Sequence, residues 1–309
     1  MEKTKNKQKY NKIPLTLDEQ VELLKERGLN IEDEQRLKYY LKNLSYYHLS
    51  IYFKHYQNNN IFYEGIGFED VLRIYVFDNK LRFLLLDLLE RIEKSFKCRV
   101  TYILSMEEKN CHWYLEEKYF DKQDEHQKIL ESITKDAEAS RELSIQHYKD
   151  TYSDPILPPI WTILEIISFG QCVHIYKSLK KEYRNKIARS FGEDEQFITN
   201  WILCLSLLRN HCAHYSRLWN RNLTYIPKSN HNVYGRLFNK KSRRLYNYLV
   251  ILQILLNEIN PTSSWLEKLE EYIKEYKINI NHMGFPESWA KNLSEIITNT
   301  PTPKTPPTT

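Results

Sequence analysis

The sequence predicts an all-α protein with several helices packed as a bundle, and three observations support that prediction. Only seven glycines occur in 309 residues, and four of the eleven prolines lie in the last ten residues, so long uninterrupted helices can form. Apolar residues recur at helical spacing through several long stretches. Because 41% of the residues are hydrophobic, the chain has enough apolar side chains to build a core.

The N-terminal region is predicted to form a short arm followed by two helices. Residues 1–14 are basic and polar, so we expect a disordered arm there. Thr16 and Glu19 have the spacing of a capping box, which begins a helix, and Gly28 is placed to end it. A second helix from about Ile31 to Leu44 would complete a helical hairpin.

The segment from Asn43 to Tyr56 is rich in aromatic residues and contains two histidines. Aromatic rings beside cationic groups can stack on nucleic-acid bases. At this spacing, however, such rings more often pack between helices. We therefore expect these side chains to belong to the core.

The middle of the chain is predicted to be helical almost throughout. Apolar residues recur at helical spacing from Glu69 to about Ser105, which predicts one unusually long helix. A further helix is expected from Asp124 to Lys149. The proline-rich segment from Asp154 to Trp161 leads into a helix that contains Glu165 and ends at residues 168–170.

The C-terminal region is predicted to add three helices. The first runs from Arg236 to Ile259 and begins with basic residues, and two shorter helices follow near residues 264–276 and 286–297. Residues 300–309 have low complexity, so we expect a disordered tail. We accordingly divide the chain into an arm, an N-terminal helical and aromatic segment, a helical core, a C-terminal helical extension and a tail: 1–14, 15–60, 61–225, 226–299 and 300–309.

Cysteine usage and the absence of long apolar stretches predict a cytoplasmic protein that does not enter a membrane. The five cysteines are odd in number and form no Cys-x-x-Cys pair, which favours a reducing compartment. The basic N-terminus lacks the apolar segment of a signal peptide. The apolar run from Tyr248 to Leu256 is too short to span a bilayer.

The candidate catalytic residues lie near the end of a predicted helix. No glycine or proline occurs from Asp194 to Trp219, and apolar residues recur there at helical spacing. Arg209 and His214 lie five residues apart in the C-terminal half of this stretch. At about 100° per residue, Asn210, His214 and Arg217 would share one polar stripe, while Arg209 would project about 140° from His214. Arg209 must therefore curl around the helix to meet this imidazole, or meet one from another chain.

These residue types suit cleavage of RNA without a metal ion. A neutral imidazole at His214 can take a proton from a ribose 2′-hydroxyl or return one to the leaving oxygen. The guanidinium of Arg209 can grip two phosphate oxygens as negative charge develops. Asn210 can orient either the imidazole or the phosphate. The expected reaction is transesterification, and DNA, which lacks the 2′-hydroxyl, should be spared.

These residues lie in a long segment whose charged side chains are all positive, which favours a polyanionic partner. From Gln196 to Asn257 there is no Asp or Glu, whereas nine Lys or Arg occur. This segment therefore carries +9 in a chain whose net charge is +5. Such a run is typical of nucleic-acid binding. We predict RNA contacts for seven of these residues: Arg217, Arg221, Arg236, Lys240, Lys241, Arg243 and Arg244.

The string LRNHCAHYSRLWNR, from Leu208 to Arg221, resembles the last conserved block of the Abi-like (AbiD and AbiF type) bacterial abortive-infection proteins. Tyr215 departs from the family pattern, where a second histidine is common. Further blocks in the expected order extend the resemblance over roughly residues 15–225, and they lie at Asn43–Phe53, Ile74–Arg82, Arg91–Phe96 and Pro159–Gly170.

The resemblance implies a HEPN-type site and a HEPN-like helical bundle. In that family the site consists of Arg, a polar residue, three more residues and His, which correspond here to Arg209, Asn210 and His214. Asp78, Arg82 and Glu93 also recur in the family pattern, but buried ion pairs explain them as well as catalysis does. Three residues are secondary candidates for the site: His211, Glu93 and Glu165.

The implied function is that of a metal-independent endoribonuclease without cofactors, acting as a toxin in anti-phage abortive infection. HEPN sites form where two motif helices meet, and this chain has one motif, so a homodimer is expected. The resemblance also implies a small structured noncoding RNA as a second partner.

Two other classes of function remain open at the level of sequence. An RNA-binding scaffold would use Arg209 and His214 only to hold phosphate, and the basic segment fits it equally well. A metal-dependent hydrolase would use His211, Cys212 and His214 as ligands. Ligands so close on one helix rarely complete a metal site unaided, and the basic segment offers no carboxylate.

Overall fold

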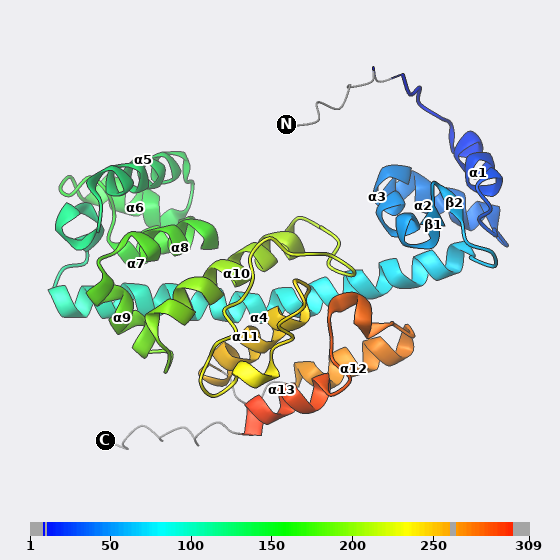
Figure 1. Ribbon diagram of the computed structural model, residues 1–309. Coiled ribbons are helices and arrows are strands. Elements are labelled where there is room, and N and C mark those ends of the chain that lie inside the picture. The colour runs from blue at the N-terminus through cyan, green and yellow to red at the C-terminus, as the bar shows by residue number, and fades with distance from the viewer. Residues whose placement is uncertain (1–8, 10, 260–263, 299–309) are drawn as a thin grey trace, which may run out of the picture. The chain divides into compact units, whose positions relative to one another are not determined.

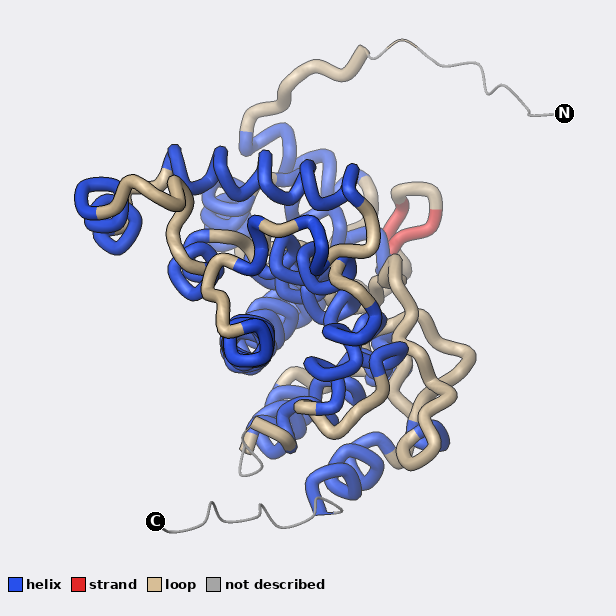
Figure 2. Tube along the Cα trace, turned by 90° about the vertical axis from the view of Figure 1, so that its left-hand side faces the viewer, coloured by secondary structure: helices blue, strands red, loops and turns tan. Residues whose placement is uncertain are grey.

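The computed structural model describes residue 9, residues 11–259 and residues 264–298. These residues form thirteen α-helices, five short 3-10 helices and one two-stranded hairpin. Figure 2 shows how completely helices dominate this part of the chain. The predicted all-α class is confirmed. The predicted tail and most of the predicted arm lie outside the described residues.

The chain divides into two compact units, with the boundary between Phe77 and Asp78. The domain boundaries predicted from the sequence, at residues 60 and 225, remain predictions. One helix, α4, contributes its first turns to unit 1 and the rest to unit 2. Each unit is described by itself below.

Unit 1 contains the predicted helical hairpin, followed by a third helix and the β-hairpin (Figure 1). The capping box is present, since Glu19 N–H donates to Thr16 Oγ1 at 3.2 Å and Thr16 N–H donates to Glu19 Oε2 at 2.6 Å. Gly28 ends the first helix with a φ of +86°. The elements are α1 (Leu17–Glu26), α2 (Glu34–Leu44), α3 (Tyr46–Phe53), η1 (Lys54–Tyr56), β1 (Gln57–Asn58) and β2 (Ile61–Phe62).

Aromatic residues of α3 build much of the core of unit 1. Tyr52 and Phe53 are fully buried, and their rings lie edge-on to Tyr75 and Phe62. The expectation that this segment packs in the core is therefore confirmed for these two residues. Tyr47 is different, because 83% of its surface is exposed.

The long predicted helix exists as α4 (Phe68–Glu108), which runs unbroken for 41 residues. Its buried face includes Leu81, Leu85, Leu88 and Ile92, at the helical spacing read from the sequence. The part of α4 that belongs to unit 2 provides one wall of the candidate site.

The helices α5 to α9 follow α4 in unit 2. Their bounds differ from the sequence predictions at two places. The single helix expected from Asp124 to Lys149 is wrong, because Ser140 is extended and its Oγ accepts a hydrogen bond from Glu142 N–H. Gly170 does not end a helix, since it lies in the first turn of a helix that begins with a Ser168–Gln171 capping box. The elements are η2 (Trp113–Leu115), η3 (Glu117–Tyr119), α5 (Gln123–Ala139), α6 (Leu143–Thr151), α7 (Ile160–Ile166), α8 (Phe169–Ser178) and α9 (Lys181–Arg189).

The last part of unit 2 contains the motif helix and the C-terminal helices. The helix predicted from Arg236 is wrong in its first ten residues, which form a short 3-10 turn and a loop. Its remainder, α11, is buried on every side. The elements are α10 (Glu195–Ala213), η4 (Gly235–Leu237), α11 (Tyr246–Asn257), α12 (Trp265–Glu275), η5 (Ile280–Met283) and α13 (Trp289–Thr298). In the described part of the chain, no helix has the length and apolarity needed to cross a membrane.

Candidate functional site

The motif lies at the C-terminal end of α10, and His214 is the capping residue of that helix. Tyr215 takes a left-handed conformation, with φ of +56°. Ser216 N–H then donates to His211 O at 2.9 Å, and Tyr215 N–H donates to Cys212 O at 3.4 Å. These two bonds define a Schellman motif, with tyrosine in the position that glycine usually occupies. The imidazole of His214 is exposed at this end.

The prediction that the helix continues to Trp219 is wrong. Because α10 stops at Ala213, Arg217 does not share a helical stripe with Asn210 and His214. The physical reason is a tertiary contact that draws the next residues away from the helix axis.

That contact is made by Asp78, which is completely buried on α4. Its carboxylate accepts hydrogen bonds from Trp219 N–H at 2.7 Å and Leu218 N–H at 3.1 Å. Arg82 Nη1 lies 2.7 Å from the second oxygen and balances the buried charge. The structural interpretation of Asp78 and Arg82 is thereby confirmed, and the segment that follows His214 is fixed to α4.

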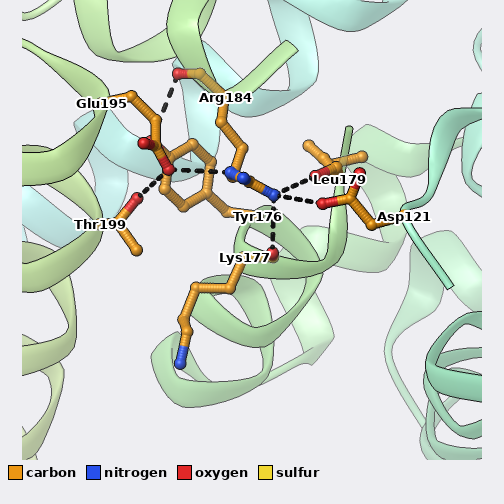
Figure 3. A network of polar contacts seen from close by, with 7 residues as sticks. All are labelled: Asp121, Tyr176, Lys177, Leu179, Arg184, Glu195 and Thr199. Carbon is orange, nitrogen blue, oxygen red and sulfur yellow. Dashed lines mark hydrogen bonds and ion pairs between the residues drawn. The ribbon is translucent and has the colours of Figure 1, made fainter. Parts of the chain in front are cut away.

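The beginning of α10 is anchored by a second polar network, centred on Arg184 (Figure 3). Arg184 Nε lies 2.9 Å from Glu195 Oε1, in the first turn of α10, and Arg184 Nη1 lies 2.7 Å from Asp121 Oδ2. Thr199 Oγ1 donates to the same Glu195 oxygen at 2.8 Å. Arg184 Nη1 also donates to the backbone carbonyls of Lys177 and Leu179. Both ends of the motif helix are thus held by buried or half-buried charges.

Arg209 is held by a carboxylate rather than by the histidine of its own motif. Its Nε lies 3.1 Å from Glu93 Oε2, and Lys97 Nζ lies 3.2 Å from Glu93 Oε1. Lys97 also donates to Ile167 O at 2.8 Å. Glu93 is nearly buried, whereas the Arg209 side chain is 33% exposed. A guanidinium has five donors, so its use of Nε here is compatible with a second anion at the Nη groups.

A groove of about 770 Å³ opens beside this ion pair, between α4, α7 and α10. It brings together three residues that were singled out from the sequence, namely Arg209, Glu93 and Glu165. Its apolar rim includes Tyr102, Met106 and Trp161, which are about half exposed or more. The other lining residues are Leu86, Glu90, Lys94, Lys97, Cys98, Thr101, Ser105, Leu164 and Ala213.

The structure does not bring all the predicted catalytic residues together. Ala213 is the last motif-helix residue that lines the groove, and His214 and Asn210 are not among the lining residues. Among the described residues, no hydrogen bond joins the side chains of Arg209 and His214. A single chain therefore presents the arginine in a groove and the histidine exposed just past the helix end.

Between α10 and α11, residues 214–245 of the basic segment form a loop, the basic loop, which is hydrogen-bonded to α10. Asn200 Oδ1 accepts from Lys228 N–H at 2.7 Å, and Trp201 Nε1 donates to Lys228 O at 3.1 Å. Lys240 and Lys241 are exposed, whereas Arg236 is engaged in an ion pair with Glu295.

The remaining arginines of the segment bond to backbone oxygens. Arg217 and Arg221 bond to the carbonyls of residues 220 and 217, and Arg243 and Arg244 to those of residues 224 and 281. These contacts shape the loop while leaving its net positive charge in place.

A model of the family described as Abi-like protein matches residues 39–220, which is more than half of the chain. The chain belongs to the Abi-like family. No match was found among curated proteins or among solved structures.

The region matched in this Abi-like protein contains every wall of the groove and the whole of α10. It also contains Asp78 together with the two backbone amides that Asp78 holds. The basic loop beyond residue 220 and the helices α11 to α13 lie outside the matched region.

Two residues at the groove were not predicted from the sequence. Lys97 binds Glu93 from one helical turn away, and the spacing of Glu93 and Lys97 on a predicted helix was a sufficient signal. Trp161 lines the groove, but its place in a proline-rich segment suggested only an architectural role.

The proposed metal ligands are not arranged as a site in the Abi-like protein. In the described ranges, no cluster of three or more His, Cys, Asp or Glu residues is placed to bind an ion. Burial raises the pKa of the Cys212 thiol to about 12. All five cysteines are free.

The stability of the Abi-like protein is expected to fall as the pH is lowered through about 6.5. Burial lowers the pKa of His112, His211 and His282, and the charges of Arg221 and Arg244 lower the last two further. The unfolded chain therefore binds more protons than the folded chain in this range, so stability rises with pH. Urea unfolding between pH 5 and 8 measures the slope, and His211→Gln should reduce it. A slope that is flat or of opposite sign would contradict the prediction.

Proposed function

We propose that this protein is a metal-independent endoribonuclease of the HEPN type that acts as a toxin in bacterial abortive infection. The observation that carries the proposal is the position of Arg209 in the wall of an open groove, with exposed His214 just past the end of the same helix. Membership of the Abi-like family supports a role in abortive infection. The spacing of arginine and histidine supports the HEPN assignment.

In the proposed reaction, His214 removes the proton from a ribose 2′-hydroxyl, and the 2′-oxygen attacks the adjacent phosphorus. The bond from phosphorus to the 5′-oxygen breaks, and that oxygen receives a proton from an imidazolium, supplied by the same or a second His214. The products carry a 2′,3′-cyclic phosphate and a 5′-hydroxyl. Arg209 stabilises the charge that develops on the phosphate, and Asn210 orients the reacting groups.

Glu93 is assigned a positioning role in this proposal. A flexible arginine loses conformational entropy when it binds phosphate, and an existing ion pair reduces that loss. Glu93 holds Arg209 through Nε, and Lys97 shares the carboxylate, so these three side chains together keep one net positive charge for a phosphate. Glu165 shares the groove and remains a secondary candidate.

We further propose that the active form is a symmetric homodimer. Each chain supplies one motif, and no hydrogen bond joins Arg209 to His214 within the described part of one chain, so a second copy would supply the complementary residue. The exposed apolar rim of the groove, formed by Tyr102, Met106 and Trp161, offers a surface for that copy. The basic loop would then bind substrate and a small noncoding RNA that restrains the toxin.

An RNA-binding scaffold is the second candidate function. No hydrogen bond joins Arg209 to His214 among the described residues, which favours this candidate because a scaffold needs no shared catalytic geometry. The two candidates differ in what happens to bound RNA, since a scaffold leaves it intact.

The test uses end-labelled single-stranded RNA in EDTA, together with the same strand carrying 2′-deoxyribose at each cleaved position. We expect cleavage of the RNA, cyclic-phosphate product ends and no cleavage at the deoxy positions, because the nucleophile is missing there. Binding of both strands without any cleavage would favour the scaffold. Cleavage that stops in EDTA and returns with a divalent ion would exclude the metal-independent mechanism.

A further inference from the structure

Unit 1 contains its own segment without acidic residues, separate from the one around the motif. From Gln35 to Tyr63 there is no Asp or Glu, whereas four Lys or Arg and two His occur. This segment contains α2 from its second residue onward, α3, η1 and the β-hairpin. Two of its cations are neutralised by acids from elsewhere in unit 1, since Arg36 pairs with Glu69 and Lys38 with Asp18.

Each of the other two cations shares a helix face with an exposed tyrosine. Tyr47 and Lys54 are seven residues apart, so at about 100° per residue they lie on one stripe that runs along α3 into η1. Tyr39 and Lys42 are three residues apart and share a face of α2. Tyr47 is 83% exposed and Tyr39 is 65% exposed, and both lysines are exposed.

The two helices that carry these stripes are joined by a one-residue turn. Only Ser45 separates Leu44, the last residue of α2, from Tyr46, the first residue of α3. No ion pair involves Lys42 or Lys54 within the described residues of the chain. The two stripes therefore present two accessible aromatic rings and two cations, with no acidic residue in the segment that carries them.

The chemistry of this surface decides between two classes of partner. Protein interfaces are enriched in tyrosine but depleted in lysine. Surfaces for unpaired nucleic acid combine aromatic platforms for bases with cations for the backbone. A paired helix would offer phosphates but no free base faces, so it would leave the exposed rings unused.

We propose that the Tyr39–Tyr47 surface, formed by Tyr39, Lys42, Tyr47 and Lys54, binds unpaired segments of RNA. The two tyrosine rings stack on bases of the strand, and the two lysines contact its phosphates. The choice of RNA over DNA rests on the proposed function, because stacking itself does not distinguish the two sugars. Binding at this surface is independent of the cleavage chemistry in unit 2.

The experiment measures binding of a fluorescently labelled single-stranded RNA of about 15 nucleotides to the full chain by anisotropy. All proteins carry His214→Ala so that the probe stays intact. We expect the double variant Tyr39→Ala/Tyr47→Ala to bind about tenfold or more weakly, because each stacked base contributes substantially to affinity. Tyr39→Phe/Tyr47→Phe should keep the parent affinity, since stacking needs the ring and not the hydroxyl.

Two further variants test the charge and provide a matched control. Lys42→Ala/Lys54→Ala should reduce the slope of log affinity against log salt by about 1.4, for two phosphate contacts on a single strand. Tyr152→Ala removes a tyrosine of unit 2 that is 54% exposed and lies outside this surface, so it should leave affinity unchanged.

Several results would overturn the proposal. The proposal is wrong if the alanine double variant binds RNA within twofold of the parent, or if Tyr152→Ala loses as much affinity as that variant. It is also wrong if the parent binds the matching DNA strand more tightly than the RNA, or binds no RNA. Circular dichroism of each variant shows whether it is folded. A folded Tyr39→Phe/Tyr47→Phe variant that keeps its affinity shows that weaker binding by the alanine variant is not caused by unfolding. Because binding is measured without cleavage, weaker binding by the alanine variant supports this surface even if the wild-type chain proves unable to cut RNA.

Discussion

Replacing His214 by alanine is expected to lower the rate of RNA cleavage by about 100- to 10,000-fold, the usual contribution of a general acid or base. His214 is exposed at the end of α10, so the variant should fold normally. The measurement is the single-turnover cleavage rate in EDTA, with RNA binding recorded in parallel. Binding should change little.

The matched control for this substitution is His147→Ala. His147 is an exposed histidine on α6, and it does not line the groove. Its removal should leave cleavage unchanged. If His214→Ala cleaves RNA at the parent rate, this histidine has no part in the chemistry, and the proposed mechanism is wrong. Equal losses in both variants would point to a general effect on folding.

Replacing Asp78 by alanine is expected to destabilise the protein by about 3–5 kcal/mol, the typical result of removing one partner from a buried ion pair. Arg82 would remain buried without its counter-charge, and the amides of Leu218 and Trp219 would lose their acceptor. Urea denaturation measures the change. Because the turn after His214 depends on this carboxylate, cleavage should also fall under conditions where the variant is still folded.

The control for Asp78 lies two and a half turns further along the same helix. Asp87 pairs with Arg91 at the same four-residue spacing, at 2.9 Å, but both side chains are exposed. Asp87→Ala should therefore cost less than about 1 kcal/mol. Comparable losses at the two positions would show that burial of the Asp78 pair is not what makes it important.

Local patterns in the sequence predicted most of the helices and the position of the motif. The capping box at Thr16 and the apolar spacing along α4 are signals contained within a few turns of chain. The end of α10 could not be predicted in this way. Tyr215 is an unusual residue for a left-handed position, and the acceptor that captures the following amides lies 140 residues upstream.

The start of α11 was missed for a similar reason. The loop before it is held by the amide of Asn247, which accepts from Asn239 N–H at 2.9 Å and donates to the carbonyls of Asn239 and Ser242 at 3.0 Å. A helical pattern of apolar residues does not reveal that an asparagine will fold the preceding residues into a loop. The charges of this segment were evident from the sequence. The ion pair between Arg236 and Glu295 was not, because it depends on the fold that brings these two residues together.

The hydrogen bonds from Leu218 and Trp219 to Asp78 also set the time at which the site can form during translation. Asp78 and Glu93 are synthesised early, whereas their partners at residues 209–219 follow more than a hundred residues later. At about 5–20 residues per second, that interval is on the order of ten seconds. A ribosome-bound chain that has not yet reached Trp219 has no anchored turn after His214. The proposed ribonuclease would therefore leave the RNA that encodes it uncut at least until Leu218 and Trp219 have been added to the chain.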